Sequence, residues 1–261
     1  MEVADGTTSR PNVDPGSQAW LDSVVETAID PEVPIIDTHH HLWPEGGAFA
    51  YGLAELESDL CSSHNIVDSV FVECRASYDD DAPPHLRPVG ETRFVAGEAA
   101  RSSMQVMGGI VAHADLTDEA HLDEVIDAHQ QAADGRFRGI RHSGSHAREP
   151  EVLAIPGRAP AGLYAQPDFR TGVRALGEHG LTYDTWHYHY QNEEFLEFAR
   201  SAPGTTIVLD HFGTPLGVGR YESQREEIYE QWRLDIEKIA ACENVVAKLG
   251  GLAMPDNGFG W

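Results

Sequence analysis

The chain has 261 residues, 41% of them hydrophobic, which fits one large α/β domain with a real core. Its 43 Asp and Glu residues outnumber 18 Lys and Arg residues, giving a formal net charge of −25. Because such a field repels phosphate backbones and anionic lipids, we expect no nucleic-acid partner and no membrane partner.

The cysteines and the apolar segments indicate the compartment. Cys61, Cys74 and Cys242 lie far apart and form no CxxC pair, which is typical of a reducing environment. The first residues form no apolar leader, and no stretch reaches the roughly 20 apolar residues that a membrane span needs. We therefore expect a cytoplasmic protein.

The composition predicts two regions. Residues 1–17 are rich in Gly, Ser, Thr, Pro and Asp and are expected to form a flexible N-terminal arm. Residues 18–261 are expected to form one barrel domain, in which short apolar runs with β-branched residues predict seven buried strands. The predicted strands span residues 33–37, 67–74, 108–113, 136–142, 181–187, 205–210 and 244–249.

Amphipathic stretches lie between these runs. In residues 119–133, an apolar stripe recurs at helical spacing through Leu122, Val125, Ile126 and His129. Further helices are predicted at residues 169–180, 192–202 and 226–242. Strands that alternate with helices predict an α/β fold of the (β/α)₈ TIM-barrel type, here with seven strands instead of eight. An open nucleotide-binding sheet is the weaker alternative, because no GxGxxG or P-loop motif follows the first strand.

The first predicted strand ends in three consecutive histidines. Side chains alternate along a strand, so His39 and His41 are expected on one face and His40 on the other. Two imidazoles at i and i+2 form a two-point clamp for a divalent metal. Asp37, on the same face, could hold a ring N–H of one of them. The alternative, a chance histidine run in a surface loop, is disfavoured by the apolar strand before it.

Histidines recur where later predicted strands end. They are His113, His142, His187, His189 and His211. In a parallel barrel these ends meet at one mouth, where catalytic groups gather. Any one of them alone would more often be a packed or capping histidine, but their shared position favours a common site.

Charged residues occupy matching positions. Glu73 ends the second predicted strand, and Arg138 and Arg141 flank the fourth. Asp210 closes the sixth strand and Lys248 the seventh. These groups supply candidates for the ligands, base and substrate anchor of a metal-assisted hydrolysis. For Glu73 and Arg138 the structural alternative is a salt bridge inside the mouth. No GxSxG elbow is present, so serine or cysteine nucleophilic catalysis is poorly supported.

Seven segments carry a resemblance to a known family. They are residues 37–43, 70–74, 86–92, 109–116, 136–143, 206–213 and 246–252. With them the sequence resembles the amidohydrolase-related family of metal-dependent (β/α)₈ hydrolases. Within that family it looks closest to the branch of fuconolactone, sulfomuconolactone and pyrone-dicarboxylate lactonases.

The resemblance implies a metal site. His39, His41 and His189 would be its ligands, with His187 as the alternative to His189. The expected cofactor is a divalent metal, zinc or else manganese, although some lactonases of this branch are thought to work without a tightly bound metal. Many relatives also use an Asp after an eighth strand. This chain ends at Trp261 before such a strand, so we expect a fragment that lacks the last barrel unit. The alternative is a naturally short protein with an open barrel.

The leading hypothesis is hydrolysis of a small carboxylated lactone by metal-activated water. Catalytic roles are assigned to His211, Asp210 and Glu73, and substrate binding to Arg138, Arg141 and His142. Arg suits a substrate carboxylate because it offers paired N–H donors. The alternatives are nonoxidative decarboxylation at a similar site and an inactive scaffold. The chain could also assemble as a homo-oligomer.

Overall fold

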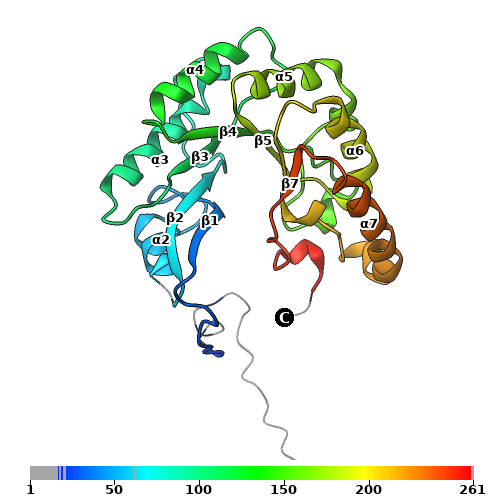
Figure 1. The fold of residues 1–261 in the computed structure, drawn as a ribbon, viewed down its shortest axis with the longest axis horizontal. Helices are drawn as coiled ribbons and strands as arrows, with labels where there is room; N and C mark the ends of the chain where they lie inside the picture. The colour runs from blue at the N-terminus through cyan, green and yellow to red at the C-terminus, as the bar shows by residue number, and fades with distance from the viewer. Residues whose placement is uncertain (1–16, 18, 20–21, 62, 260–261) are drawn as a thin grey trace, which may run out of the picture.

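One parallel sheet organises the protein (Figure 1). The computed structural model describes residues 17, 19, 22–61 and 63–259. Seven strands lie side by side in chain order, from β1 at one edge to β7 at the other. They are β1 Pro34–His40, β2 Asn65–Val72, β3 Gly109–Ala112, β4 Phe137–Arg141, β5 Thr182–Thr185, β6 Ile207–Leu209 and β7 Val245–Ala247. This order confirms the predicted fold of the (β/α) TIM-barrel type, with seven strands.

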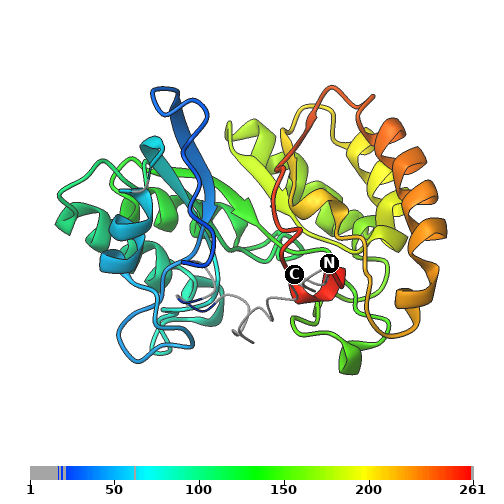
Figure 2. The same ribbon diagram turned by 90° about the horizontal axis from the view of Figure 1, so that it is seen from below.

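Helices cover the outer, convex face of the curled sheet (Figure 1). They are α2 Leu53–Leu60, α3 Val89–Arg101, α4 Leu122–Ala132, α5 Pro167–Glu178, α6 Asn192–Ser201 and α7 Arg225–Ile239. Short 3₁₀ turns are η1 Pro84–Leu86, η2 Pro150–Val152, η3 Leu163–Ala165, η4 His189–Gln191, η5 His211–Gly213, η6 Gly219–Gln224 and η7 Pro255–Asn257. Figure 2 shows the N-terminal units on one side of the molecule and the C-terminal units on the other.

Four of these helices, α4 to α7, occupy the predicted amphipathic stretches, whereas α2 and α3 were not predicted. The failure at α3 has a physical explanation. In α3 the buried face includes Glu91 and Thr92, and the helix contains Gly90 and Gly97, so its apolar stripe is broken. The inward polar groups make contacts that a hydrophobic pattern cannot reveal.

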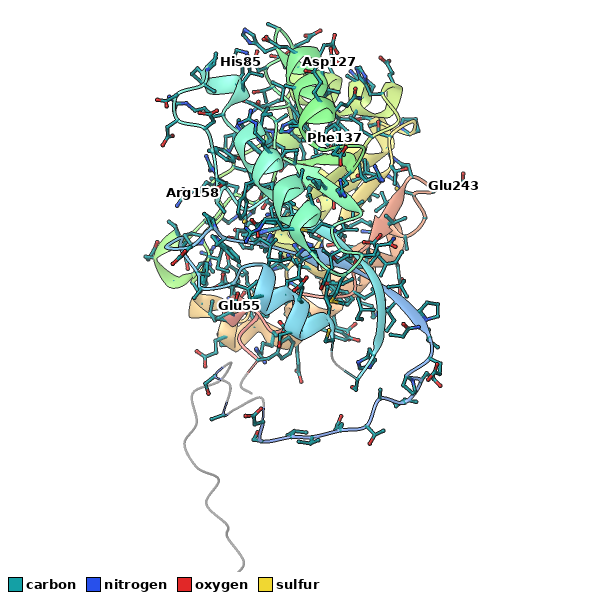
Figure 3. The ribbon with its side chains drawn as sticks, turned by 90° about the vertical axis from the view of Figure 1, so that its left-hand side faces the viewer. Glu55, His85, Asp127, Phe137, Arg158 and Glu243 are labelled. Carbon is teal, nitrogen blue, oxygen red and sulfur yellow. The ribbon has the colours of Figure 1, made fainter. Side chains whose placement is uncertain are left out.

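The predicted stripe of α4 faces the sheet. Leu122, Val125, Ile126 and His129 are all buried. Asp127 on the same helix is exposed, whereas Phe137 at the start of β4 is buried (Figure 3). The rings of His129 and Phe137 stack with their centres 5.4 Å apart. Burial of this stripe fixes the helix against the strand that carries Arg141 to the mouth.

Two further expectations concern the N-terminal arm and membrane-spanning segments. The predicted arm, residues 1–17, lies outside the described residues except for Ser17, so its boundary at residue 18 stays a prediction. Within the described part of the chain, no helix has the length and apolar content to cross a membrane.

A pH test of the core follows from His129, which is fully buried. Its Nε2–H donates to the His113 carbonyl at 3.0 Å, and its Nδ1 accepts from the Thr92 hydroxyl at 2.8 Å. Burial lowers the pKa of His129 to about 4. The unfolded chain therefore binds a proton near pH 6.5 that the folded chain does not bind, so stability falls as the pH drops from 6.5 to 4. At pH 5 this histidine should cost about 2 kcal/mol.

Urea unfolding at pH 7 and pH 5 measures this effect. The difference in unfolding free energy between the two pH values should shrink in His129→Gln. It should be unchanged in His64→Gln, since the His64 side chain is exposed. An undiminished pH dependence in His129→Gln would show that this ring is not the source.

Candidate functional site

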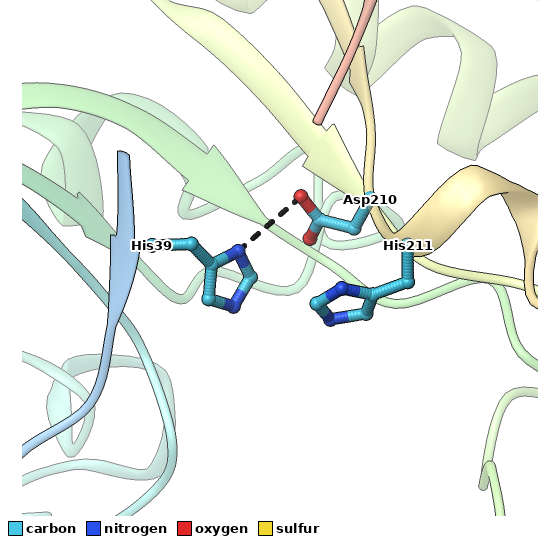
Figure 4. A group of neighbouring side chains, drawn as sticks. All are labelled: His39, Asp210 and His211. Carbon is cyan, nitrogen blue, oxygen red and sulfur yellow. Dashed lines mark ion pairs between the residues drawn. The ribbon is translucent and has the colours of Figure 1, made fainter. Parts of the chain in front are cut away.

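Three side chains converge where β1 and β6 end (Figure 4). His39 is part of β1, and Asp210 and His211 directly follow β6. One potential ligand atom from each lies within 4.8 Å of the others. His39 Nδ1 is 3.5 Å from Asp210 Oδ1, and the rings of His39 and His211 have centres 4.8 Å apart. Residues distant in sequence thus meet because parallel strands end at one rim.

Lys248, whose side chain is 13% exposed, joins this group to β5. Lys248, just after β7, places its Nζ 2.8 Å from Asp184 Oδ2 and 3.3 Å from Asp210 Oδ1. The same Nζ lies 3.3 Å from His39 Nδ1. The side chains of Asp184 and Asp210 are 2% and 0% exposed, so both carboxylates depend on nearby cations for compensation.

Arg141 provides the second cation. Its Nε donates to Glu73 Oε1 at 3.0 Å, and its Nη2 donates to the Glu73 backbone carbonyl. Its Nη1 is 3.8 Å from Asp210 Oδ2. Asp210 therefore lies between two cations, Lys248 on one oxygen and Arg141 on the other. Burial by itself would raise the pKa of Asp210, but His39, Lys248 and Arg141 outweigh it and hold the pKa well below its usual range.

The imidazoles beside these charges are kept neutral. Burial lowers the pKa of His211 to about 4, although Asp210 opposes the shift. Burial and the charge of Arg141 also hold the pKa of His41 well below its ordinary value. His41 Nδ1 lies 2.7 Å from the Val72 carbonyl, which fixes the proton on that nitrogen and leaves a lone pair on Nε2. Neutral imidazole is the form that binds metals and accepts protons.

The backbone that carries His211 is strained. His211, Phe212, Gly213 and Thr214 all have positive φ values, of 55°, 56°, 65° and 38°. Gly251, at φ 80°, lies against the His211 ring, and a Cβ there would come within 2.4 Å of Nδ1. Strain of this kind is costly for residues other than glycine and concentrates at functional sites. Position 251, in the loop after β7, therefore requires a glycine, because any side chain there would collide with the His211 ring.

An open cavity of about 410 Å³ adjoins this group. Its walls include five predicted site residues: His41, Glu73, Arg141, His142 and His211. This size suits a small-molecule ligand. The cavity and the charged cluster thus share His211 and Arg141.

Two predicted site residues lie elsewhere. Arg138 donates to the carbonyls of Gly135, Phe137 and Gly108 and lies on the exposed side of β4. It is three residues from Arg141, and an odd separation along a strand turns the two side chains to opposite faces. The salt bridge considered for Glu73 is present, but its partner is Arg141.

His189 is the first residue of the turn η4. Its Nδ1 accepts from the Leu216 backbone N–H at 3.2 Å, and its ring packs edge-on against Tyr221. The alternative ligand, His187, is fully buried, with Nε2 2.9 Å from Asn192 Oδ1 and Nδ1 3.0 Å from the Tyr164 hydroxyl. Neither joins the group formed by His39 and His211.

Asp184 was not recognised from the sequence, and Lys248 was noted only as a strand-end cation. A carboxylate inside the otherwise uncharged run 181–187 was the available signal for Asp184. Lys248 is one of only two lysines in the chain. An inward-facing charge in a parallel strand requires a partner, which the pairing of Asp184 with Lys248 provides.

The family model described as amidohydrolase matches residues 36–260. The chain belongs to the amidohydrolase family. The chain is similar to the L-fucono-1,5-lactonase of Burkholderia ambifaria, 26% identical over 219 residues that cover 83% of this chain and 67% of that protein. The uncharacterized protein y4mH of Sinorhizobium fredii is 29% identical over 252 residues, covering 85% and 74% of the two chains.

Solved amidohydrolase structures share the fold. A zinc-bound amidohydrolase from Burkholderia multivorans superposes with a TM-score of 0.60 at 23% identity, covering 83% of this chain and 69% of that one. Amidohydrolase 2 from Bifidobacterium longum subsp. infantis gives 0.54 at 15% identity, covering 84% and 73%. These structures support the fold, and the family-model match over residues 36–260 confirms the predicted family.

Removal of Lys248 tests the charged cluster. Lys248→Met should lower the unfolding free energy by about 3–5 kcal/mol, because it leaves Asp184 and Asp210 buried beside each other. Adding Asp184→Asn to this variant should recover part of the loss, since it removes one of the two anions.

Denaturant unfolding of the single and double variants checks this prediction. Lys238→Met is the matched control, because Lys238 is 56% exposed and pairs with Asp235 on the same helix. It should cost less than about 1 kcal/mol. Equal losses in Lys248→Met and Lys238→Met would contradict the role assigned to the Lys248 ammonium.

Proposed function

We propose that this amidohydrolase opens a small carboxylated lactone by hydrolysis, assisted by a divalent metal. The observation that carries the proposal is the convergence of His39, Asp210 and His211 beside the 410 Å³ cavity. The lactonase activity named for the Burkholderia ambifaria relative supports the reaction class. The zinc in the Burkholderia multivorans structure supports zinc as the first metal to test, with manganese second.

The residues present fit such a metal. His39 Nε2 and His211 Nδ1 are buried and have no hydrogen-bond partner among the described residues, and the Asp210 oxygens have ion-pair contacts at 3.3 Å or more. Buried polar atoms rarely stay unsatisfied, and imidazole with carboxylate is a donor set that suits zinc. His39, Asp210 and His211 would therefore hold the metal, in place of the set His39, His41 and His189 expected from the sequence. A bound divalent metal supplies Lewis acidity that polarises a carbonyl and acidifies water.

The protein's own residues have distinct tasks. His41 lines the cavity and can accept a proton through the Nε2 lone pair that its bond to Val72 leaves free. Asp210 faces Lys248 and Arg141, and it serves as a fixed negative charge. Glu73 and Arg141 neutralise each other and hold the cavity wall in place. His142 contributes a ring to the same wall.

Metal binding is testable without activity. Zinc or manganese added to metal-stripped protein should raise the melting temperature, by an amount that corresponds to about 2.7 kcal/mol at a hundredfold excess over Kd. The double variant His39→Ala/His211→Ala should show no such shift. His64→Ala, whose side chain is exposed, should shift like the unaltered protein. A metal-induced shift that survives in the double variant would place the metal elsewhere.

Activity provides a second test. Hydrolysis of sugar lactones and carboxylated lactones, followed by acid release, should fall at least about 100-fold in His41→Ala, because a general base contributes about that factor or more. His187→Gln serves as a buried histidine control outside the cavity. Product analysis separates the alternative reaction: release of carbon dioxide without ring opening would replace the lactonase by a decarboxylase. Metal binding without turnover of either kind would favour a ligand-binding scaffold.

A further inference from the structure

Three arginines line the cavity, and only one of them is neutralised. Arg141 is buried against Glu73 and Asp210. Arg75 and Arg158 also line the cavity, and neither makes an ion pair with a carboxylate among the described residues. Their side chains are exposed at its rim. The cavity therefore presents two guanidinium groups that remain available to a ligand.

Local cations matter in so acidic a chain. Acidic residues outnumber basic ones by 43 to 18. Some exposed arginines are neutralised by a carboxylate, as Arg93, Arg101 and Arg220 are by Asp79, Glu98 and Glu149, at 3.5, 2.6 and 2.9 Å. The overall field would repel an anionic ligand, so recognition of one requires local cations. Two uncompensated arginines at one cavity provide them.

Arg75 is held in its place by a buried carboxylate. Its φ of 63° lies in the left-handed region, which side chains other than glycine seldom adopt. Glu91, 2% exposed on α3, accepts hydrogen bonds from the backbone N–H groups of Cys74 at 3.2 Å and Ala76 at 2.7 Å. The backbone is thus clamped on both sides of Arg75. The guanidinium carbon lies 5.8 Å from the centre of the Tyr78 ring.

Arg158 lies on a loop that is also fixed. It pairs with His146 in an antiparallel bridge, and the next residue, Ala159, donates to the Ser145 carbonyl at 2.9 Å. Gly157 donates to the Tyr188 hydroxyl at 2.7 Å. Figure 3 shows Arg158 on the opposite side of the molecule from Glu243, which precedes β7. Arg158 therefore belongs to the rim at the carboxyl ends of the strands.

The rest of the cavity wall suits a cyclic ligand. Trp186 and Met254 contribute apolar surface, and Ser143 and Ser145 contribute hydroxyl groups 2.7 Å apart. A ligand with a compact body and an anionic group would place the body against this wall and the anionic group toward the rim. Arg recognises carboxylates through paired N–H donors.

We propose that Arg75 and Arg158 form the carboxylate-recognition pair that selects charged lactones over neutral ones. This inference rests on the proposed function for the identity of the substrate. It moves substrate recognition away from Arg138, which lies outside the cavity, and from Arg141, whose charge is already compensated.

Binding of simple probes tests the pair without any turnover. Glutarate is the probe, and glutaramide is its uncharged counterpart of similar shape. Calorimetric titration should show that glutarate binds the unaltered protein and that Arg75→Gln and Arg158→Gln each weaken this binding about tenfold or more. Arg75→Lys should recover part of the affinity. Glutaramide binding should be equally weak in all of them.

Arg174→Gln is the matched control. Arg174 is an exposed arginine on α5 whose side chain donates to Thr171 Oγ1 at 3.1 Å, and it does not line this cavity. Its replacement should leave glutarate binding unchanged. Thermal melting of each variant verifies folding, which the two exposed cavity arginines should not affect.

Kinetics supply an independent measurement. For a carboxylated lactone the variants should raise KM about tenfold or more with kcat little changed, because both arginines bind away from the reacting carbonyl. For a neutral lactone both constants should stay the same. Glutarate binding that depends on the arginines, without any lactone turnover, would keep this inference and remove the proposed function. Lactone turnover with glutarate binding absent, or unaffected by either replacement, would overturn the inference and keep the function.

Discussion

The ammonium group of Lys248, enclosed by Asp184, Asp210 and His39, is the contact on which the site depends. It connects the two edge strands of the sheet, since His39 belongs to β1 and Lys248 follows β7. Two carboxylates this deeply buried would repel each other without the ammonium between them. The side chains of the candidate site are therefore positioned by electrostatic compensation as much as by backbone geometry.

Most of the fold was predictable because it rests on local patterns. Short β-branched runs and amphipathic stretches report burial directly, and they identified seven strands and four helices. The failure at α3 has the same origin, since Glu91 is buried there for its contacts with the backbone around Arg75. A hydrophobic pattern cannot anticipate a residue that is buried in order to accept hydrogen bonds.

The sequence predicted where the candidate site lies, at the carboxyl ends of the strands, but not which neighbouring side chains form it. The triple histidine and the Asp210–His211 pair could be placed at strand ends, and the structure brings His39 and His211 together. The choice between neighbouring residues depends on details of strand and turn geometry. Side chains alternate between the two faces of β4, so Arg141 and Arg138 lie on opposite faces. His189 begins the turn η4, where its ring contacts Tyr221. The loops that carry Arg75 and Arg158 have no periodic pattern, so these residues emerged only from their position in space.

The arrangement of the sheet edges has a mechanical consequence. Among the described residues, β1 and β7 are the outer strands, and backbone hydrogen bonds join each of them to one neighbour only. The contact between Lys248 and His39 therefore links the two outer strands of the curled sheet. Because Asp184 and Asp210 are buried, dissolved ions screen their pairs with Lys248 only weakly. A movement that separates β1 from β7 would part Lys248 from His39 without breaking a backbone hydrogen bond between neighbouring strands.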